Sequence, residues 1–362
     1  MVTWRKGGRA ILAHARRAAK EVEASGGTDT ARVRLARDLL RGRVGDDQFG
    51  RLALALAALT VDERHYKVGV FYTLLLSADV WRDQAAYFTP PYLANAVLSL
   101  AVEYGFDLRS GSVLDPAAGG AAFLSTIAAR MSIEGAKPSK IARRLRGVEI
   151  DPGLARISRA LIAERLMLGG VFSIDVRVAD ALRRRWKAEF DLVVANPPYG
   201  RITPAALTGD HWQKVAHRGN LIQYAVFAEL CLRAAKPGAL IALVIPSSFR
   251  TGPLYTKLLG YLRDQAQVLC VAAMRRAGQW KRMKFDARER AKSLTTRPDR
   301  AGGIGSGTCD VARNAAASEA FNAADSHAAA SSFSCVIRLA RLILSVANSA
   351  IPNAMATKAA PM

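Results

Sequence analysis

The feature that most constrains the fold is the alternation of short apolar runs and helix-like stretches between Tyr87 and Met274. Each run ends in Asp, Glu, Asn or Pro; the runs are SVLDP, LRGVEID, VRVAD, DLVVANPP and ALIALVIPSS, with QVLCVAAM as a further candidate. Strands of this kind separated by helices predict a parallel, doubly wound sheet. The expected fold class is therefore α/β. A ligand is expected beyond the carboxyl ends of the strands, where the polar residues stand.

The segments on either side of this alternation have a different character. Residues 1–85 are rich in Leu, Ala and Arg at helical spacing, which predicts a helical N-terminal extension whose basic faces are solvated or contact nucleic acid. Residues 275–362 are basic and then rich in Ala, Ser and Gly, which predicts an irregular, low-complexity tail. Within that tail, CVIRLARLILSV is a candidate for one short helix or strand. The central domain is predicted to span 86–274.

Charge and cysteine content narrow the class of protein. The net charge is +22 and the pI about 10.4, which favours a polyanionic partner, although charge alone does not separate nucleic acid from an anionic membrane. The chain has no apolar run near the roughly 18 residues that span a bilayer and no secretory h-region, so we expect a soluble, cytoplasmic protein. The four cysteines lack CxxC spacing, which favours reduced thiols; they are Cys231, Cys270, Cys309 and Cys335.

Three familiar catalytic motifs are absent from the sequence. It contains no HExxH, no GxxxxGK followed by Ser or Thr, and no GxSxG. A metalloprotease, a P-loop NTPase and a serine hydrolase therefore lose their simplest support, and no metal site is expected.

Three successive predicted strands end on an acidic residue. The first, in GSVLDPAAGGAAFL, runs through Asp115 into a turn with Gly119 and Gly120, which lets the backbone approach a ligand and present amide donors. Glu149 ends the next strand and suits two ribose hydroxyls, and Asp180 ends the third. Each acid taken singly is equally well explained as a helix N-cap. Three in succession predict a cofactor cleft.

The fourth strand ends in NPPYG, a combination poor for both helix and sheet. The side-chain oxygen of Asn196 and the main-chain carbonyl of Pro197 form a rigid pair of acceptors, and Tyr199 adds a flat face. Such a pair suits the NH2 group of an exocyclic amine or a carboxamide. It aims the nitrogen lone pair at an electrophile without a nucleophilic side chain or a metal. The alternative, a Pro-rich turn, is weaker because the motif closes a buried strand.

With these motifs in place, residues 61–274 resemble the adenine-N6 DNA methyltransferases of bacterial restriction-modification systems. The matching segments are AAYFTPPYLANAVL, DPAAGGAAFL, GVEIDP, ADAL, NPPYG and GNLIQYAVFAELCLRAAKPGALIALVIPSSF. Their order, with YFTP first and NPPY after the glycine turn, is similar to the gamma arrangement. The resemblance implies a class I, Rossmann-like methyltransferase fold with a mostly parallel twisted sheet.

The resemblance also implies S-adenosylmethionine as cofactor, double-stranded DNA as substrate, and a restriction endonuclease or separate specificity subunit as possible partners. By residue-by-residue carry-over, the cofactor site comprises Thr89 and Pro90 at the methionine moiety, Asp115, Pro116, Ala117 and Gly119 around it, Glu149 and Ile150 at the ribose, Asp180 and Ala181 at the adenine, and Asn196. The target adenine is implied to contact Asn196, Pro197, Pro198 and Tyr199, with Tyr199 stacked on the flipped base.

The sequence departs from the family pattern in two places. Ala121 stands where the family usually has a third small turn residue, Gly, and its Cβ is expected to crowd the cofactor if φ is positive there. The family's last strand pair, with a second base-stacking aromatic, and its target-recognition domain have no match in 275–362. The abrupt change near Met274 is typical of an out-of-frame reading of a GC-rich gene.

Two other functions remain open at this stage. Protein glutamine-N5 methylation uses the same NPPY geometry on a carboxamide, although the basic charge, the YFTP segment and the DPA turn argue against it. The third hypothesis is an inactive remnant that binds cofactor or DNA without turnover.

Overall fold

The computed structural model describes residues 29–40, 48–74, 89–167, 174–216, 221–246, 256–276, 279–283 and 340–347. Within these ranges the strands predicted from the apolar runs are confirmed. They are β1 (Val113–Asp115), β2 (Leu145–Glu149), β3 (Asp175–Val178), β4 (Phe190–Ala195), β5 (Ala235–Pro246) and β6 (Ala266–Arg276).

These strands belong to one sheet with the order β3-β2-β1-β4-β5-β8-β6-β7. The pairs from β3 through β6 are parallel, and β6 pairs antiparallel with β7 (Gln279–Met283). The chain moves outward from β1 to β3 and then returns to place β4 on the other side of β1. This reversal of direction opens a crevice beyond the carboxyl ends of β1 and β4.

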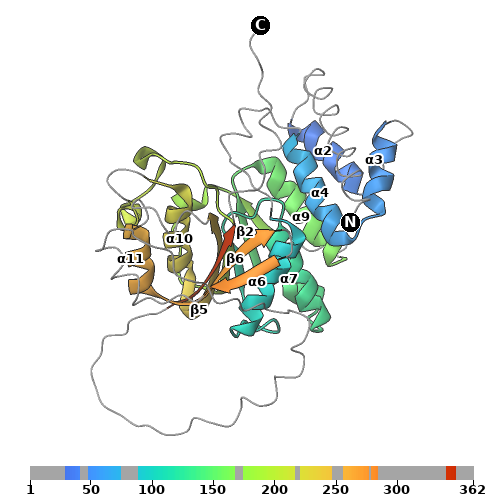
Figure 1. Ribbon diagram of the computed structural model, residues 1–362. Coiled ribbons are helices and arrows are strands. Elements are labelled where there is room, and N and C mark those ends of the chain that lie inside the picture. Colours follow the sequence, from blue (N-terminus) through green and yellow to red (C-terminus); the bar gives the residue numbers. More distant parts are fainter. Residues whose placement is uncertain are drawn as a thin grey trace, which may run out of the picture.

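Helices cover both faces of the sheet (Figure 1). On one side lie α6 (Pro91–Glu103), α7 (Ala122–Ile133), α8 (Pro138–Arg144) and α9 (Pro152–Arg165); on the other lie α10 (Gln223–Ala234) and α11 (Thr256–Gln265). Neighbouring strand residues therefore enter different cores: Val113 and Leu192 pack under α6, α7 and α9, whereas Leu114 and Val193 pack under α10. Burial on both faces explains why these strands read as continuous apolar runs.

The helical N-terminal extension is confirmed for its described residues. It contains α2 (Asp29–Leu40), α3 (Gln48–Ala57) and α4 (Val61–Leu74), grouped beside α9 (Figure 1). Helix α4 begins with a capping box, because Glu63 N–H donates to Thr60 Oγ1 at 3.3 Å while Thr60 N–H donates to Glu63 Oε2 at 3.3 Å. The boundary predicted at residue 85 lies outside the described residues.

The sheet extends beyond the boundary predicted at Met274. Strand β6 continues to Arg276, β7 follows, and β8 (Ala340–Ala347) lies between β5 and β6, parallel to both. Here the structure differs from the expected irregular tail, and the candidate segment CVIRLARLILSV contributes a strand. Its run LIL, residues 342–344, is apolar, which is typical of strands in parallel sheets. The frame-shift hypothesis stays a prediction.

Among the described residues no helix is long and apolar enough to cross a membrane, and no group of three His, Cys, Asp or Glu side chains is placed to hold a metal ion. Cys231 and Cys270 are buried free thiols, whereas Cys309 and Cys335 lie outside the described residues.

Candidate functional site

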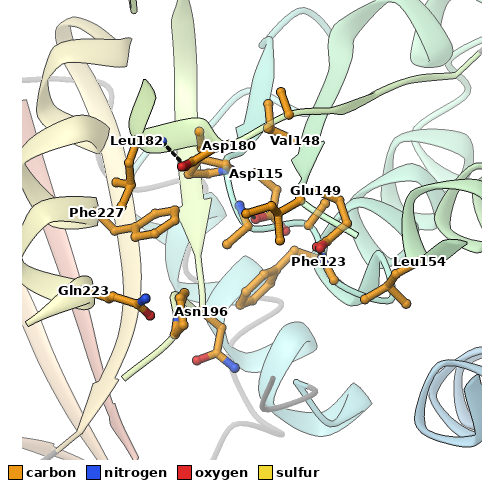
Figure 2. Close-up of a pocket in the computed structure, with 18 of the residues that line it drawn as sticks. Asp115, Phe123, Val148, Glu149, Leu154, Asp180, Leu182, Asn196, Gln223 and Phe227 are labelled. Carbon is orange, nitrogen blue, oxygen red and sulfur yellow. Dashed lines mark hydrogen bonds between the residues drawn. The ribbon is translucent and has the colours of Figure 1, made fainter. Parts of the chain in front are cut away.

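A cavity of about 210 Å³ lies at the carboxyl ends of β1 to β4. The structure brings most of the sequence-predicted residues to its wall: Thr89, Asp115, Pro116, Ala117, Gly119, Glu149, Ile150, Asp180, Ala181, Asn196 and Pro198. Pro90, Pro197 and Tyr199 do not line it. Figure 2 shows Asp115, Glu149 and Asp180 toward one end of the cavity and Asn196 and Gln223 toward the other.

Backbone N–H groups of the glycine turn after β1 donate hydrogen bonds to the ends of β1 and β2. Ala117 N–H donates to Asp115 Oδ1 at 3.1 Å, and Ala118 N–H donates to the Val148 carbonyl of the neighbouring strand at 2.9 Å. Gly119 has φ of +52°, a left-handed conformation that favours glycine, and its N–H donates to Glu149 Oε2 at 2.8 Å. The turn therefore joins the ends of β1 and β2 into one rigid wall.

Two carboxyl groups are buried in this wall. Burial raises the pKa of Asp115 to about 8, the Ala117 hydrogen bond opposes that rise, and the nearby charge of Glu149 adds to it. Burial likewise raises the pKa of Glu149, against hydrogen bonds from Asp151 and Gly119. Neither acid has a basic side chain among the causes of its shift, so the wall carries buried acceptors that a cationic or hydroxyl-bearing ligand would satisfy.

The helix-capping alternative holds for one of the three acids. Asp180 Oδ1 accepts from Leu182 N–H at 2.9 Å and so caps the short 3₁₀-helix η1 (Ala181–Arg183), while its other oxygen lies 3.4 Å from Arg183 Nε. Glu149 caps no helix, because the cap of α9 is Asp151. Asp180 nevertheless lines the cavity, so capping and ligand contact are compatible there.

Ala121 is left-handed, with φ of +57°, and caps the N-terminus of α7. This is the positive φ at which the Cβ of Ala121 is expected to crowd the cofactor. The expected crowding is not found, because the side chain is fully buried in the core under α6 and α7, and Ala121 is not part of the cavity wall. Alanine in place of glycine at position 121 therefore strains the backbone and does not narrow the cavity.

Asn196, directly after β4, is held by two hydrogen bonds. Its Nδ2 donates to Thr89 Oγ1 at 3.1 Å, and its Oδ1 accepts from Tyr199 Oη at 2.7 Å. Nδ2 faces the Thr89 hydroxyl and Oδ1 faces the Tyr199 hydroxyl, so the amide is oriented from both of its ends. The side chain is thus a pre-oriented acceptor on the cavity wall.

Tyr199 supports this amide from outside the cavity. Its ring meets Tyr224 edge-to-face, with ring centroids 6.2 Å apart and an interplanar angle of 86°. The NPPYG segment is further tied to the start of α10, because Gln223 N–H donates to the Gly200 carbonyl at 2.9 Å and Arg201 forms an antiparallel bridge with Ile222. These contacts fix the end of β4 relative to α10.

Sequence reasoning missed about half of the cavity wall. The missed residues are Ala118, Ala122, Phe123, Val148, Leu154, Ala179, Leu182, Ile202, Gln223 and Phe227, whereas Gly120 was expected in the ligand-binding turn together with Gly119. Gln223 and Phe227 stand four residues apart on α10, a spacing that puts both on one face of the helix. Helical periodicity could therefore have predicted that the two side chains face the same cavity. The others are mostly apolar residues that sequence alone does not distinguish from core.

The strand order and a cavity walled by acids at consecutive strand ends define a class I methyltransferase fold. The family model described as N-6 DNA Methylase matches residues 68–276, which is more than half of the 362-residue chain. The chain belongs to this family.

Solved structures similar to the chain include three with methyltransferase or restriction-modification descriptions. A protein from Listeria monocytogenes described as a class I S-adenosylmethionine-dependent methyltransferase shares 13% identity over 75% of this chain and 83% of its own, with a TM-score of 0.47. A type I restriction-modification methyltransferase subunit from Streptococcus thermophilus shares 16% sequence identity; the match covers 70% of this chain and 60% of that one, with a TM-score of 0.42. The Type ISP restriction-modification enzyme LlaBIII bound to DNA shares 13% sequence identity; the match covers 74% of this chain and 22% of that one, with a TM-score of 0.49.

Proposed function

We propose that this chain transfers a methyl group from S-adenosylmethionine to the N6 amino group of adenine in DNA. The observation that carries the proposal is the placement of Asn196, whose Oδ1 acceptor is fixed by Thr89 and Tyr199 on the wall of the cavity that also holds Asp115 and Glu149. A cofactor wall and an amine acceptor thus share one cavity.

The residues present fit the cofactor. Glu149 accepts backbone N–H groups on both of its oxygens, and we assign the remaining acceptor capacity of the carboxylate to the ribose hydroxyls. Asp115 is a buried acid with no salt bridge among the described residues, which suits a positively charged ligand, and Asp180 keeps acceptor capacity beyond its cap for the adenine amine. Thr89 lies next to Asn196, and we assign it with Pro90 to the methionine moiety. Bound there, S-adenosylmethionine supplies an electrophilic methyl group.

Asn196 acts on the amine of the target base. We propose that its Oδ1 and the carbonyl of Pro197, a buried residue beside the cavity wall, accept the two N6 hydrogens, which draws the nitrogen lone pair out of conjugation and directs it along the line of attack. Flipping of the base is required because N6 is engaged in pairing inside a duplex. Tyr199 was expected to stack on that base. Its hydrogen bond to Asn196 supports an additional role, that of holding the acceptor amide.

The biological setting is part of the proposal. We infer a bacterial restriction-modification role in the cytoplasm, with double-stranded DNA as substrate and with a nuclease or specificity subunit supplied by another chain. We propose a helical extension over 1–85 followed by a catalytic domain that begins at 86, and the sheet of that domain takes in β7 and β8 from the segment predicted as a tail over 275–362.

The test compares methyl transfer from labelled S-adenosylmethionine to mixed-sequence duplex DNA by the native chain and by Asn196→Ala. A matched control is Asn95→Ala, which removes another half-buried amide with a hydrogen bond, Nδ2 to the Pro91 carbonyl at 2.9 Å, on α6 away from the cavity. Label on adenine N6 that is retained in Asn95→Ala and lost in Asn196→Ala supports the proposal.

The same assay separates the alternatives. A release-factor peptide offered beside the DNA would take up label at glutamine if the chain were a protein methyltransferase. A folded chain that binds DNA in a salt-sensitive manner and transfers no methyl to either substrate would be the inactive remnant, and the proposal would then be wrong.

A further inference from the structure

Helix α4 of the N-terminal extension touches the methyltransferase domain through a fully buried tyrosine. Tyr72 has no exposed surface and lies over Gly153 in the first turn of α9. A Cβ at Gly153 would lie 1.9 Å from Tyr72 Oη, so no side chain fits at that position without moving the tyrosine. The two helices are therefore in contact at the point where α9 begins.

From this point a chain of hydrogen bonds leads to the cavity wall. Tyr72 Oη donates to Asp151 Oδ1 at 2.9 Å, and the same oxygen accepts from Leu154 N–H at 2.6 Å, which makes Asp151 the N-cap of α9. The backbone N–H of Asp151 donates to Glu149 Oε1 at 2.9 Å. Only one residue, Asp151, separates the hydroxyl of α4 from the cofactor-facing carboxyl.

The rest of α4 is fixed to α7 and α9 by polar contacts. Arg64 Nη2 and His65 Nε2 lie 2.5 Å and 3.2 Å from the two oxygens of Glu164 on α9, and His65 Nδ1 lies 3.1 Å from Ser125 Oγ on α7. Asp62 pairs with Arg165 of α9. These contacts attach the N-terminal half of α4, whereas Tyr72, near its other end, contacts Asp151 directly.

We propose that α4 is part of the cofactor site and that Tyr72 is a positioning residue for Glu149. The tyrosine hydroxyl fixes the Asp151 carboxylate, the carboxylate fixes the peptide at the start of α9, and that peptide orients one of the two Glu149 oxygens. This inference rests on the proposed function, in which Glu149 holds the cofactor ribose. It gives the extension a role in cofactor affinity.

The test is Tyr72→Phe in the full-length chain, with S-adenosylmethionine affinity measured by titration calorimetry. Phe keeps the packing over Gly153 and removes only the hydroxyl. Loss of one buried hydrogen bond predicts an affinity about three- to tenfold weaker. The matched control is Tyr104→Phe, which removes a hydroxyl that donates to the Leu269 carbonyl at 3.3 Å, far along the chain from Glu149; its affinity should be unchanged.

Three further measurements distinguish a positioning role of Tyr72 from a purely structural one. Arg64→Met weakens the attachment of α4 but leaves the Tyr72 link, so it should lower the melting temperature without changing cofactor affinity. In steady-state methyl transfer, Tyr72→Phe should raise the KM for S-adenosylmethionine and leave kcat within about twofold. In a Glu149→Gln background, Tyr72→Phe should have no further effect on affinity.

A second variant cuts the same link from the other side. Asp151→Ser retains a good N-cap for α9 but is too short to reach Tyr72 Oη, so it should weaken cofactor binding as Tyr72→Phe does. If Glu149→Gln leaves affinity unchanged, the proposed cofactor role of Glu149 fails. If Glu149→Gln weakens binding while both Tyr72→Phe and Asp151→Ser leave it intact, only the inference about α4 fails.

Discussion

The buried acid at the end of β1 makes the stability of the ligand-free protein depend on pH. Burial raises the pKa of Asp115 from about 3.8 to about 8, so between these values the folded protein retains a proton that the unfolded chain has released. The unfolded state then binds fewer protons, and stability falls as pH rises through this window. Each pH unit is worth about 1.4 kcal/mol for one fully shifted group. From pH 5 to pH 7 the expected loss is therefore about 3 kcal/mol.

Asp115→Asn isolates this contribution. Asn keeps the shape and the Oδ1 acceptor for Ala117 N–H but does not titrate. Two other buried groups overlap the same range: Glu149, whose pKa burial raises, adds to the loss, and His65, whose pKa burial lowers, opposes it as the unfolded histidine titrates. Both remain in the variant, so the difference between the two proteins reports Asp115.

The assay is urea unfolding without cofactor at pH 5, 6 and 7, followed by tryptophan fluorescence. We expect the unfolding free energy of the native chain to fall relative to that of Asp115→Asn by about 1.4 kcal/mol per pH unit. Parallel pH dependences would refute the reasoning, because they would mean that Asp115 is ionised in the folded protein. Spectroscopic titration of the Asp115 carboxyl group would then show a pKa below 5.

Three further outcomes follow from the geometry. Ala121→Gly removes the strain of a left-handed alanine and should raise the melting temperature, because this strain of about 1–2 kcal/mol exceeds the roughly 0.8 kcal/mol gained by burying the alanine methyl group. The control, Ala128→Gly inside α7, should lower the melting temperature. Tyr199→Phe loses the hydrogen bond to Asn196 and should slow single-turnover methyl transfer about fivefold with cofactor affinity unchanged; equal rates would contradict its support of the amide. Cys231 is fully buried and burial raises its pKa, so iodoacetamide should leave it unmodified in the folded protein, as peptide mass spectrometry would show.

The sequence by itself determined the strand positions and the residues at their ends. Apolar runs bounded by polar residues are local patterns, and the carboxyl ends of parallel strands meet at one edge wherever the helices pack. For that reason the sequence alone places Asp115, Glu149, Asp180 and Asn196 at one edge of the sheet. The family resemblance rested on the same local motifs.

Only the tertiary structure decided how these residues are held. That Tyr199 supports Asn196 from outside the cavity, that Asp151 rather than Glu149 caps α9, and that α4 reaches Asp151 through Tyr72 all depend on contacts between distant segments. The placement of β8 between β5 and β6 is of the same kind. A local pattern fixes which face of an element is apolar, but the partner that covers that face is chosen by packing over the whole chain.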